Sequence, residues 1–376
     1  MVYFNLYKQV DAYCGYQIMK AIIASLNFNP GHLSHLMANY KLLSEANVSV
    51  SLLWHPAFNE YCPSDFSPKF SNVIDLFRLG KGDIFIVWFP SISALVNMLF
   101  LKVFGRGKII YIFHEPFDSI QSYLAAGFSP AKTIRIVLVS FVNRLLVACS
   151  DKIILASDKA YITFKIRYRN KNSFVKIPLM FDDELKDSVL PEKRSFISYI
   201  GTVAEDHAFK EFVNYVAHAL EWNLFPDFKF LIATRSVLPV DASSLLSRFS
   251  NNERLIVVSG SPLTNRQINH YFADSVIVWN AYKRSMQSGI LPKAYMFGTP
   301  VISAEGNRSE YFVDGKTGTE INKGYNVDEI SAAIGLVTSD FYAYSQFCRE
   351  KFLSCFYYKA LSEKFLSFVF EDERKA

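Results

Sequence analysis

Residues 287–318 hold a candidate phosphate-binding segment, with the sequence QSGILPKAYMFGTPVISAEGNRSEYFVDGKTG. The pattern predicts a tight turn at Ser288 and Gly289 that opens a helix. The first N–H groups of a helix have no partner within it and lie at the positive end of its dipole, which favours an anion. Glycine also lets a ligand approach the backbone closely. We therefore expect the amides near Gly289, Ile290 and Leu291 to bind phosphate whatever their side chains are.

His114 is the side chain best placed for chemistry. It follows the strand predicted at Lys108–Phe113, and Pro116 stops the chain from continuing into a helix there. Ligands of α/β folds bind at the carboxyl ends of parallel strands, and an imidazole in that position can donate a hydrogen bond that stabilises developing charge. The alternative is a histidine that only supports the fold. Gly31 and His32 follow the first predicted strand in the same way.

A third loop begins the second half of the chain, in the run YIGTVAEDHAFK from Tyr199 to Lys210. Its pattern is a strand that ends at Gly201, then a loop, then a helix. Such a loop either binds a ligand or is an ordinary turn between a strand and a helix, and its residues alone leave both interpretations open.

Short apolar runs alternate with longer helical stretches, which is the pattern of a parallel α/β fold. Strands are predicted at Met19–Leu26, Val48–Trp54, Asp83–Phe89, Lys108–Phe113, Lys152–Ala156, Phe196–Ile200, Lys229–Ile232, Leu255–Val258, Ser275–Trp279 and Thr299–Ser303. Helices are predicted at His32–Ala46, Ser93–Val103, Ala131–Val147 and in the tail Tyr342–Phe370. Residues 1–17 form an added segment before the first strand. The domain boundary is expected within the Pro-containing, charged linker at about 178–195.

The length of 376 residues is enough for two domains, and the hydrophobic fraction of 51% is high. One uncharged run, Ile84–Leu101, approaches the length of a membrane-spanning helix. Pro90 and Ser91 interrupt it, so strand, turn and helix is the favoured interpretation. The N-terminus lacks the pattern of a signal peptide, and we expect a cytoplasmic protein.

The net charge of +5 is modest and unevenly distributed. Cations crowd the segment 132–194 and include Lys132, Arg135, Arg144, Lys152, Lys159, Lys165, Arg167, Arg169, Lys171, Lys176, Lys186, Lys193 and Arg194. One interpretation is a solvated basic face. The other is attraction to an anionic membrane surface, because apolar residues are interleaved with the charges. Nucleic acid is the weakest option, since no recognised binding motif accompanies the charge.

The five cysteines are scattered and odd in number, which predicts reduced thiols rather than a disulfide framework or a zinc site. No His-Glu-x-x-His, Asp-x-Asp or Cys/His cluster occurs at metal-ligand spacing, so no metal is expected.

The order of motifs in residues 196–320 resembles the donor-binding half of the retaining, family 4 glycosyltransferases of the GT-B fold. The resemblance implies two facing Rossmann-like α/β domains with a deep cleft between them and a C-terminal helix that returns to the first domain. The expected divisions are an acceptor-binding domain at 1–190, a nucleotide-sugar-binding domain at 191–345 and the returning helix at 346–376. The Gln287-Ser288-Gly289 turn is similar to that of enzymes that assemble bacterial surface polysaccharides.

The resemblance also implies roles for single residues. His114 would contact the donor sugar near its reacting carbon, and Glu310 would approach the ribose of the nucleotide. Gly31 and His32 would border the acceptor and the diphosphate. The family's loop supplies an Arg and a Lys to the diphosphate, but this chain has Thr202 and His207 there. Lys210 or Arg235 would then replace the missing cations.

Two glutamates of the family are likewise replaced, by Ser285 and Lys293. The first glutamate contacts the donor sugar and the second the ribose, so donor binding would depend more on the backbone amides near Gly289. Lys293 either approaches phosphate or, as the favoured interpretation, faces solvent on its helix.

These features favour a glycosyltransferase that moves a hexosyl unit from a UDP- or GDP-sugar to a lipid-linked glycan at the inner face of the cell membrane. Retaining members react on one face of the sugar with the leaving phosphate as base, which requires neither a carboxylate pair nor a cofactor. A non-catalytic GT-B scaffold of a polysaccharide-assembly complex is the alternative, because the family's charged residues are missing. A nucleotide-sugar epimerase is a weaker one, since it would be expected to carry carboxylates in the cleft.

Overall fold

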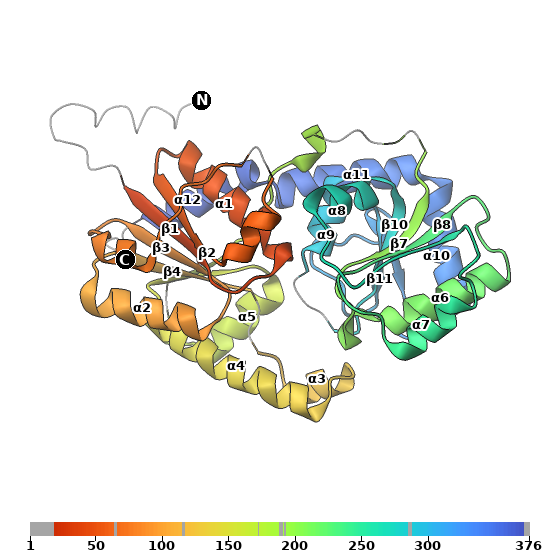
Figure 1. Cartoon of the computed structure of the whole chain (residues 1–376), viewed down its shortest axis with the longest axis horizontal. Helices are drawn as coiled ribbons and strands as arrows, with labels where there is room; N and C mark the ends of the chain where they lie inside the picture. The colour runs from red at the N-terminus through yellow and green to blue at the C-terminus, as the bar shows by residue number, and fades with distance from the viewer. Residues whose placement is uncertain are drawn as a thin grey trace.

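A computed structural model describes residues 19–63, 66–114, 117–171, 173–187, 191, 193–284 and 288–371. The segment 1–17, which contains one of the five cysteines, Cys14, lies outside the described residues, as do Pro116, Ser285 and Gln287. The chain forms two α/β domains, which lie side by side in Figure 1.

The first domain is built on a sheet of six parallel strands in the order β2-β1-β3-β4-β5-β6. These strands are β1 Lys20–Ser25, β2 Ser49–Trp54, β3 Ile84–Trp88, β4 Lys108–Phe113, β5 Lys152–Leu155 and β6 Phe174–Lys176. The strands β1, β3, β4 and β5 are buried almost throughout, because helices cover both faces of a parallel sheet.

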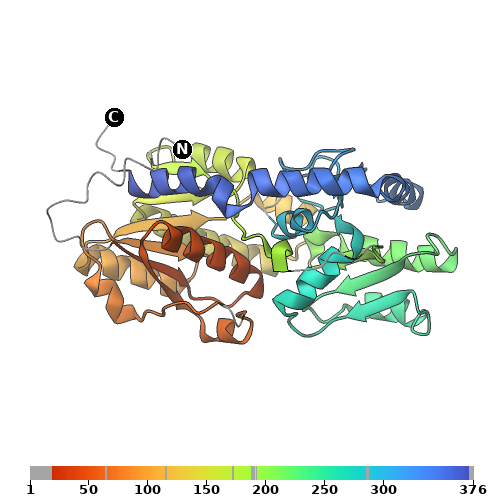
Figure 2. The same ribbon diagram turned by 90° about the horizontal axis from the view of Figure 1, so that it is seen from above.

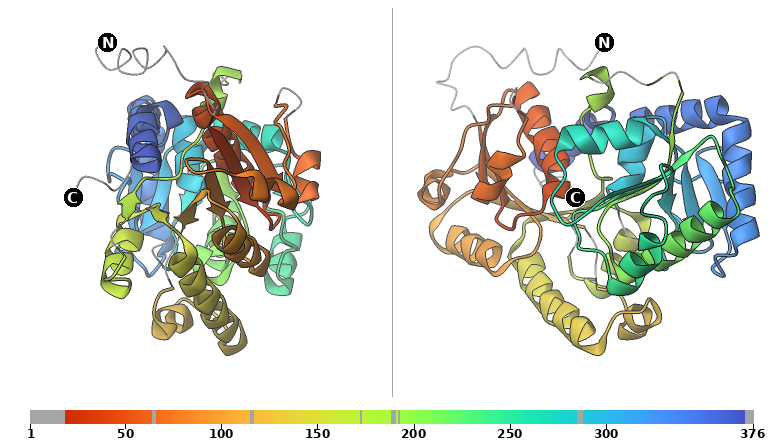
Figure 3. Two further views of the ribbon diagram at one scale, coloured as in Figure 1. Left: turned by 90° about the vertical axis from the view of Figure 1, so that its left-hand side faces the viewer. Right: turned by 45° about the vertical axis from the view of Figure 1, so that its right-hand side comes forward.

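The helices of the first domain are α1 Leu33–Glu45, α2 Ile92–Phe104, α3 Ile120–Ala125, α4 Pro130–Cys149 and α5 Asp158–Arg167. Short 3-10 turns lie at η3 Pro30–His32, η4 Pro56–Glu60 and η5 Val73–Arg78. Serine hydroxyls cap four of the helices at their N-termini, at Ser91, Ser119, Ser129 and Ser157. Figure 3 shows α4, in yellow, projecting beyond the body of this domain.

The second domain repeats the plan with six parallel strands in the order β12-β11-β10-β7-β8-β9. They are β7 Phe196–Ile200, β8 Lys229–Ala233, β9 Leu255–Val258, β10 Ser275–Asn280, β11 Val301–Ala304 and β12 Gly318–Ile321. The other elements are η6 Glu184–Asp187, η7 Glu205–His207, α6 Phe209–Glu221, α7 Val240–Ser247, α8 Asn265–Ala273, α9 Ile290–Met296 and α10 Val327–Ser339.

Two helices at the end of the chain connect the domains: α11 Phe341–Cys355 and α12 Tyr358–Phe370. Figure 2 shows them in blue, end to end across both domains. The helix α11 packs on α9 of the second domain, whereas α12 packs on α1 of the first. Lys152 Nζ donates to the carbonyls of Phe368 and Glu371, both at 2.5 Å, and so holds the end of α12 on the first sheet.

The observed architecture is the GT-B fold, with the predicted C-terminal helix returning to the first domain. All ten predicted strands form, and Ile84–Leu101 divides as predicted into β3, a turn and α2. Two strands were not predicted, β6 and β12. Both are short edge strands, and β12 begins inside a run of turn-forming residues, so a local pattern could not reveal either.

Within the described residues, no helix has both the length and the apolar character that crossing a bilayer requires. The four cysteines in this part of the chain are all free thiols, and Cys348 is buried.

Arg194 anchors the start of the second domain. Its guanidinium is buried and donates to the carbonyls of Phe272, Ser275 and Phe297 and to the hydroxyl of Thr299, at 2.6–3.3 Å. Burial lowers its pKa to about 10. This one side chain therefore joins the linker to α8, β10 and the turn after α9.

Replacing Arg194 by Met should lower the free energy of unfolding by about 3 kcal/mol or more, because several buried carbonyls lose their donor. Urea denaturation measures the loss. The matched control is Arg248→Met, which breaks an exposed pair with Glu221 and should cost about 1 kcal/mol or less. Equal losses in the two variants would contradict the anchoring role.

Candidate functional site

A cavity of about 540 Å³ lies between the two domains. Each domain contributes the loops that follow the carboxyl ends of its strands. In the first sheet the strand order reverses between β1 and β3, and in the second between β7 and β10. Residues after these four strands line the cavity, namely Asn29, Gly31, His32, Phe89, Gly201, Thr202 and Tyr282. Open parallel sheets bind ligands at such switch points, so both domains direct a ligand to the same space.

Three histidines form the first-domain wall. His32 and His114 stack with ring centroids 5.8 Å apart, and His35 stacks on Trp88 at 5.4 Å. Trp88 also lies 4.9 Å from the His114 ring. His35 Nδ1 lies 3.1 Å from the Met180 carbonyl, which fixes that ring. The predicted candidates His114, His32 and Gly31 thus all reach the cavity.

His35 was not predicted, although the sequence carried a signal for it. It lies three residues after His32, and residues three apart share one face of a helix. A Cβ built on Gly289 would lie 3.7 Å from His35 Nε2, so the two walls of the cavity approach each other here.

Burial keeps these imidazoles neutral. It lowers the pKa of His32 to about 3, with His35 and Arg235 adding to the effect. It lowers the pKa of His35 to about 4, against the opposing hydrogen bond to the Met180 carbonyl. The pKa of His114 is lowered well below its usual range by burial, then by His32 and His35. His114 Nε2 and His32 Nδ1 are shielded from solvent and have no hydrogen-bond partner among the described residues. Each therefore has one free position for a ligand.

The loop after β7 forms part of the opposite wall. His207 Nδ1 lies 2.7 Å from the Thr202 carbonyl, and its ring stacks on Tyr282 at 4.6 Å. Burial lowers the His207 pKa, against the opposing charge of Asp206. The predicted residues Thr202 and His207 therefore line the cavity, but His207 is a packed neutral ring rather than a cation.

The start of α9 also reaches the cavity, through Ser288, Gly289 and Ile290. The expectation of bare amides needs a correction, because the Ile290 N–H donates to Ser288 Oγ at 3.1 Å. Pro292, in the same turn, has no N–H at all. The side chain of Leu291 is buried and is not part of the cavity wall. The helix start consequently offers fewer donors than its sequence suggested.

Gly201 makes the approach of α9 possible. Its φ is +141°, and a Cβ there would lie 3.3 Å from Ile290 Cδ1. Only glycine adopts such a conformation readily. The glycine that ends β7 is therefore needed for the second-domain wall.

Arg235, after β8, is a cavity-lining cation without an ion-pair partner in the described part of the chain. Its charge is close enough to lower the pKa of His32 on the facing wall. Lys210, the other predicted replacement, lies on the exposed side of α6 with Nζ 3.9 Å from Asp241. It does not line the cavity, because it is one helical turn beyond the loop.

Lys293 was predicted to face solvent, and that prediction is wrong. Its side chain is buried and lines the cavity, with Nζ 2.7 Å from Glu184 Oε2. Asn265 and Asn269 also donate to this carboxylate, at 2.5 and 2.8 Å. A carboxylate from the linker thus neutralises the cation, a contact that no local sequence pattern could reveal.

Glu310, like Lys210, does not line the cavity. Its carboxylate accepts from the Asp158 N–H at 2.8 Å, at the N-terminus of α5, and lies 4.0 Å from Lys176 Nζ. The predicted contact to a ribose is not supported by this position. Glu310 instead joins the second domain to the first.

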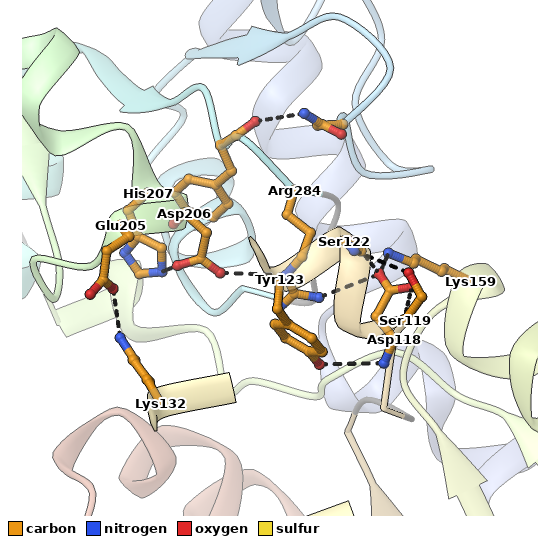
Figure 4. Close-up of polar contacts among 12 residues, drawn as sticks. Asp118, Ser119, Ser122, Tyr123, Lys132, Lys159, Glu205, Asp206, His207 and Arg284 are labelled. Carbon is orange, nitrogen blue, oxygen red and sulfur yellow. Dashed lines mark hydrogen bonds and ion pairs between the residues drawn. The ribbon is translucent and has the colours of Figure 1, made fainter. Parts of the chain in front are cut away.

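A polar network that was not predicted also joins the domains, and Figure 4 shows it. Arg284, after β10, lies 3.5 Å from Asp206 and 3.9 Å from Asp118 of the first domain, with its guanidinium 4.8 Å from the Tyr123 ring centre. Nearby, Lys132 at the start of α4 pairs with Glu205 at 2.5 Å. These contacts hold α3 and the start of α4 against the loop that carries His207.

No group of three or more His, Cys, Asp or Glu residues in the described ranges is arranged to hold a metal ion. Neither Asp nor Glu occurs among the described residues that line the cavity. The arrangement can therefore offer neutral imidazoles, backbone amides and the cation of Arg235 to a ligand.

Comparisons with known proteins support the fold. No family model matches the sequence, and no curated protein matches it. Among solved structures, Anabaena HepE in complex with UDP and glucose is similar, with a TM-score of 0.63, 13% identity and coverage of 93% of this chain and 98% of that one. The pneumococcal O-GlcNAc transferase GtfA in complex with UDP and GlcNAc is also similar, with a TM-score of 0.67 and 11% identity. The match covers 94% of this chain and 99% of the GtfA chain.

A third similar structure is WaaG, a glycosyltransferase involved in lipopolysaccharide biosynthesis. Its TM-score is 0.58 at 12% identity, and 94% of this chain and 100% of that chain are covered. At these identities the likeness is one of fold.

The buried histidines predict how stability depends on pH. Their folded-state pKa values lie below the unfolded value of 6.5, so their stabilising effect is present above pH 6.5 and is lost as the pH falls towards 4 and 3. Each of His32 and His35 should lower the free energy of unfolding by about 2 kcal/mol at pH 5 relative to pH 7.

Urea denaturation of the wild type and of His35→Asn at both pH values tests this. The variant should lose about 2 kcal/mol less than the wild type between pH 7 and pH 5. His270→Asn, at an exposed site on α8, should behave as the wild type. The same pH dependence in wild type and His35→Asn would contradict a neutral, buried His35.

Proposed function

We propose that this protein is a glycosyltransferase that moves a hexosyl unit from a UDP- or GDP-sugar to a hydroxyl of a lipid-linked glycan. The observation that carries the proposal is the cavity between the domains, which both sheets border at their switch points. One wall presents His114, and the facing wall presents Arg235 and the start of α9. HepE and GtfA, which have similar folds, form complexes with UDP and a sugar, which makes a UDP-sugar the first donor to test.

The proposed reaction breaks the bond between the anomeric carbon and the diphosphate oxygen. The acceptor hydroxyl oxygen bonds to the same carbon and face, so that configuration is retained. The hydroxyl proton passes to the departing phosphate, and no protein carboxylate is needed. Arg235 and the backbone N–H of Gly289 would stabilise the charge on the diphosphate without a metal or a cofactor.

His114 would donate or accept one hydrogen bond with the donor sugar. Its buried, neutral ring and unpartnered Nε2 suit that role, because a preorganised dipole in a site shielded from water acts strongly on developing charge. Because its pKa is lowered, this imidazole is neutral near pH 7 and would not transfer a proton as a general acid, although it can still donate a hydrogen bond.

The acceptor and the location are parts of the same proposal. We propose a cytoplasmic protein at the inner face of the cell membrane that acts in surface-polysaccharide assembly, such as O-antigen, capsule or exopolysaccharide. Support comes from the basic and apolar segment of the first domain and from the likeness to WaaG, which is involved in lipopolysaccharide biosynthesis. Both the lipid-linked glycan and an anionic membrane surface would be partners.

A non-catalytic scaffold is the second candidate, since His207 is a neutral ring where the resembled family has a lysine. It is less favoured, because an unpartnered Nε2 and an unpaired cation face the cavity. An epimerase is disfavoured by the lack of Asp and Glu among the described residues of the cavity wall.

Turnover of one nucleotide-sugar from a panel of UDP- and GDP-sugars, with membrane extract as the acceptor source, tests the proposed activity. His114→Ala should lower kcat by roughly a hundredfold or more and change the Kd for the nucleotide little. His270→Ala, outside the cavity, is the control and should leave both unchanged. Absence of binding and turnover across the whole panel would favour the scaffold.

Arg235→Gln should raise the Kd for UDP by roughly tenfold, since one charged hydrogen bond contributes about 1.5–3 kcal/mol. Lys210→Gln removes the same charge from outside the cavity and should change the Kd less than twofold. Isothermal titration measures both values. A larger increase in the Kd for UDP in Lys210→Gln than in Arg235→Gln would instead identify Lys210 as the diphosphate contact.

A further inference from the structure

A second pocket, of about 610 Å³, adjoins the interdomain cavity on the first domain. It lies between α4, the end of α5 and residues 117–119. Four residues belong to the walls of both spaces: Phe113, Phe117, Ser140 and Asn143. The pocket and the cavity are therefore neighbours that share one wall, and His114 also lines the cavity.

Two guanidiniums line this pocket, those of Arg144 and Arg167. Burial raises the pKa of Tyr168, another wall residue, and the charges of both arginines oppose that rise. Both arginines therefore belong to the same pocket wall as Tyr168.

Neither arginine has a carboxylate partner within ion-pair distance among the described residues. Arg167 donates to the Phe117 carbonyl. The acid in the pocket wall, Asp118, pairs with Lys159 at 2.7 Å and accepts from Ser122 Oγ at 3.1 Å. The pocket thus carries positive charge that the described part of the chain does not neutralise. Arginine pairs of this kind bind phosphate groups well.

An apolar surface lies on another face of α4, where Phe141 is three residues, about one helical turn, from Arg144 of the pocket wall. On α4, the side chains of Ile134, Leu138, Phe141 and Leu145 are all exposed, Leu138 by 66%. On the adjacent helix α2, those of Ile92, Val96, Leu99 and Val103 are exposed as well, Val103 by 70%. In both helices the spacing is four, three and four residues, which places each set in one stripe along the helix. Figure 1 shows α2 and α4 together on the underside of the first domain.

The charges on these two helices have one sign. Neither α2 nor α4 contains an acidic residue, whereas α4 carries Lys132, Arg135 and Arg144. Lys102 and Lys132 pair with Asp151 and Glu205, whereas Arg135 and Arg144 have no carboxylate partner among the described residues. Large exposed apolar surfaces mark interaction sites, and an apolar stripe beside such cations suits a molecule with a hydrocarbon part and a negative head.

We propose that the pocket of Arg144 and Arg167 is an acceptor subsite that binds the phosphate or diphosphate of a lipid-linked acceptor. The hydrocarbon chain of the acceptor lies over the apolar stripes of α4 and α2. Its glycan extends past Ser140 and Asn143 into the cavity, towards His114. This assignment rests on the proposed glycosyltransferase function, to which it adds the site and the chemistry of acceptor recognition.

The test uses farnesyl diphosphate, which carries both chemical parts of such an acceptor, with inorganic diphosphate and farnesol as the separate parts. Binding to the full-length protein is measured by isothermal titration with UDP at saturating concentration, so that a donor site is already filled. Farnesyl diphosphate should bind at least roughly tenfold more tightly than either part alone.

Two double variants separate the contributions of charge and apolar contact. The variant that combines Arg144→Gln and Arg167→Gln should raise the Kd for farnesyl diphosphate by roughly tenfold or more. The variant that combines Leu138→Ser and Phe141→Ser should raise the Kd for farnesyl diphosphate but leave the Kd for inorganic diphosphate unchanged. Arg135→Gln removes a charge from the same helix outside the pocket and is the matched control, which should bind as the wild type. Thermal unfolding checks that each variant is folded.

Unchanged binding by the folded arginine double variant would overturn the proposal. An equal loss of affinity for farnesyl diphosphate in Arg135→Gln would also overturn it, because that result would indicate a non-specific charge effect. Inorganic diphosphate that binds as tightly as farnesyl diphosphate would identify a free phosphate as the ligand and exclude the apolar stripes. The affinity of the wild type for UDP is measured separately, so failure of the proposed donor site is distinguished from failure of the acceptor subsite.

Discussion

The relative placement of the two domains depends on a short backbone contact where the chain crosses between them twice. The Phe181 N–H donates to the Phe356 carbonyl, and the Tyr358 N–H donates to the Phe181 carbonyl, both at 2.9 Å. This pair of bonds joins the outgoing linker to the returning tail. Next to it, Arg349 pairs with Asp183 and Lys293 with Glu184, which fix the linker on the second domain. Because both sheets are anchored at this crossing, the ends of their strands face one space.

The electrostatics of that space follow from its burial. Histidines that enter it from the first domain lose their charge because desolvation disfavours the protonated form. The buried Lys293 keeps a carboxylate partner, as a buried charge must. Arg235 alone among the cavity-lining cations of the described chain lacks one. An anion in the cavity would therefore meet one concentrated positive charge among neutral donors.

Much of the fold could be predicted from local patterns, because parallel strands buried on both faces are continuous apolar runs. The strands at Lys108–Phe113 and Phe196–Ile200 match their predicted bounds. Candidates at the ends of these strands, such as His114 and Thr202, reach the cavity for the same reason. The short edge strands β6 and β12 have too few residues to give such a signal.

Predictions that depended on helix faces or long-range partners were less successful. Lys293 is buried because Glu184, more than a hundred residues earlier in the chain, neutralises it. Glu310 turns away from the cavity to cap α5 of the other domain. The polar network around Arg284 joins three separate segments. In each case the deciding partner comes from a distant segment, and only the folded arrangement reveals it.

The central claim is that a nucleotide diphosphate binds between the two domains. A crystal structure of the protein with UDP tests it most directly. We expect the diphosphate between Arg235 and the backbone at Gly289, on the side of the cavity that faces His114. UDP bound outside the interdomain cavity, or no UDP in crystals grown at millimolar UDP, would contradict the account.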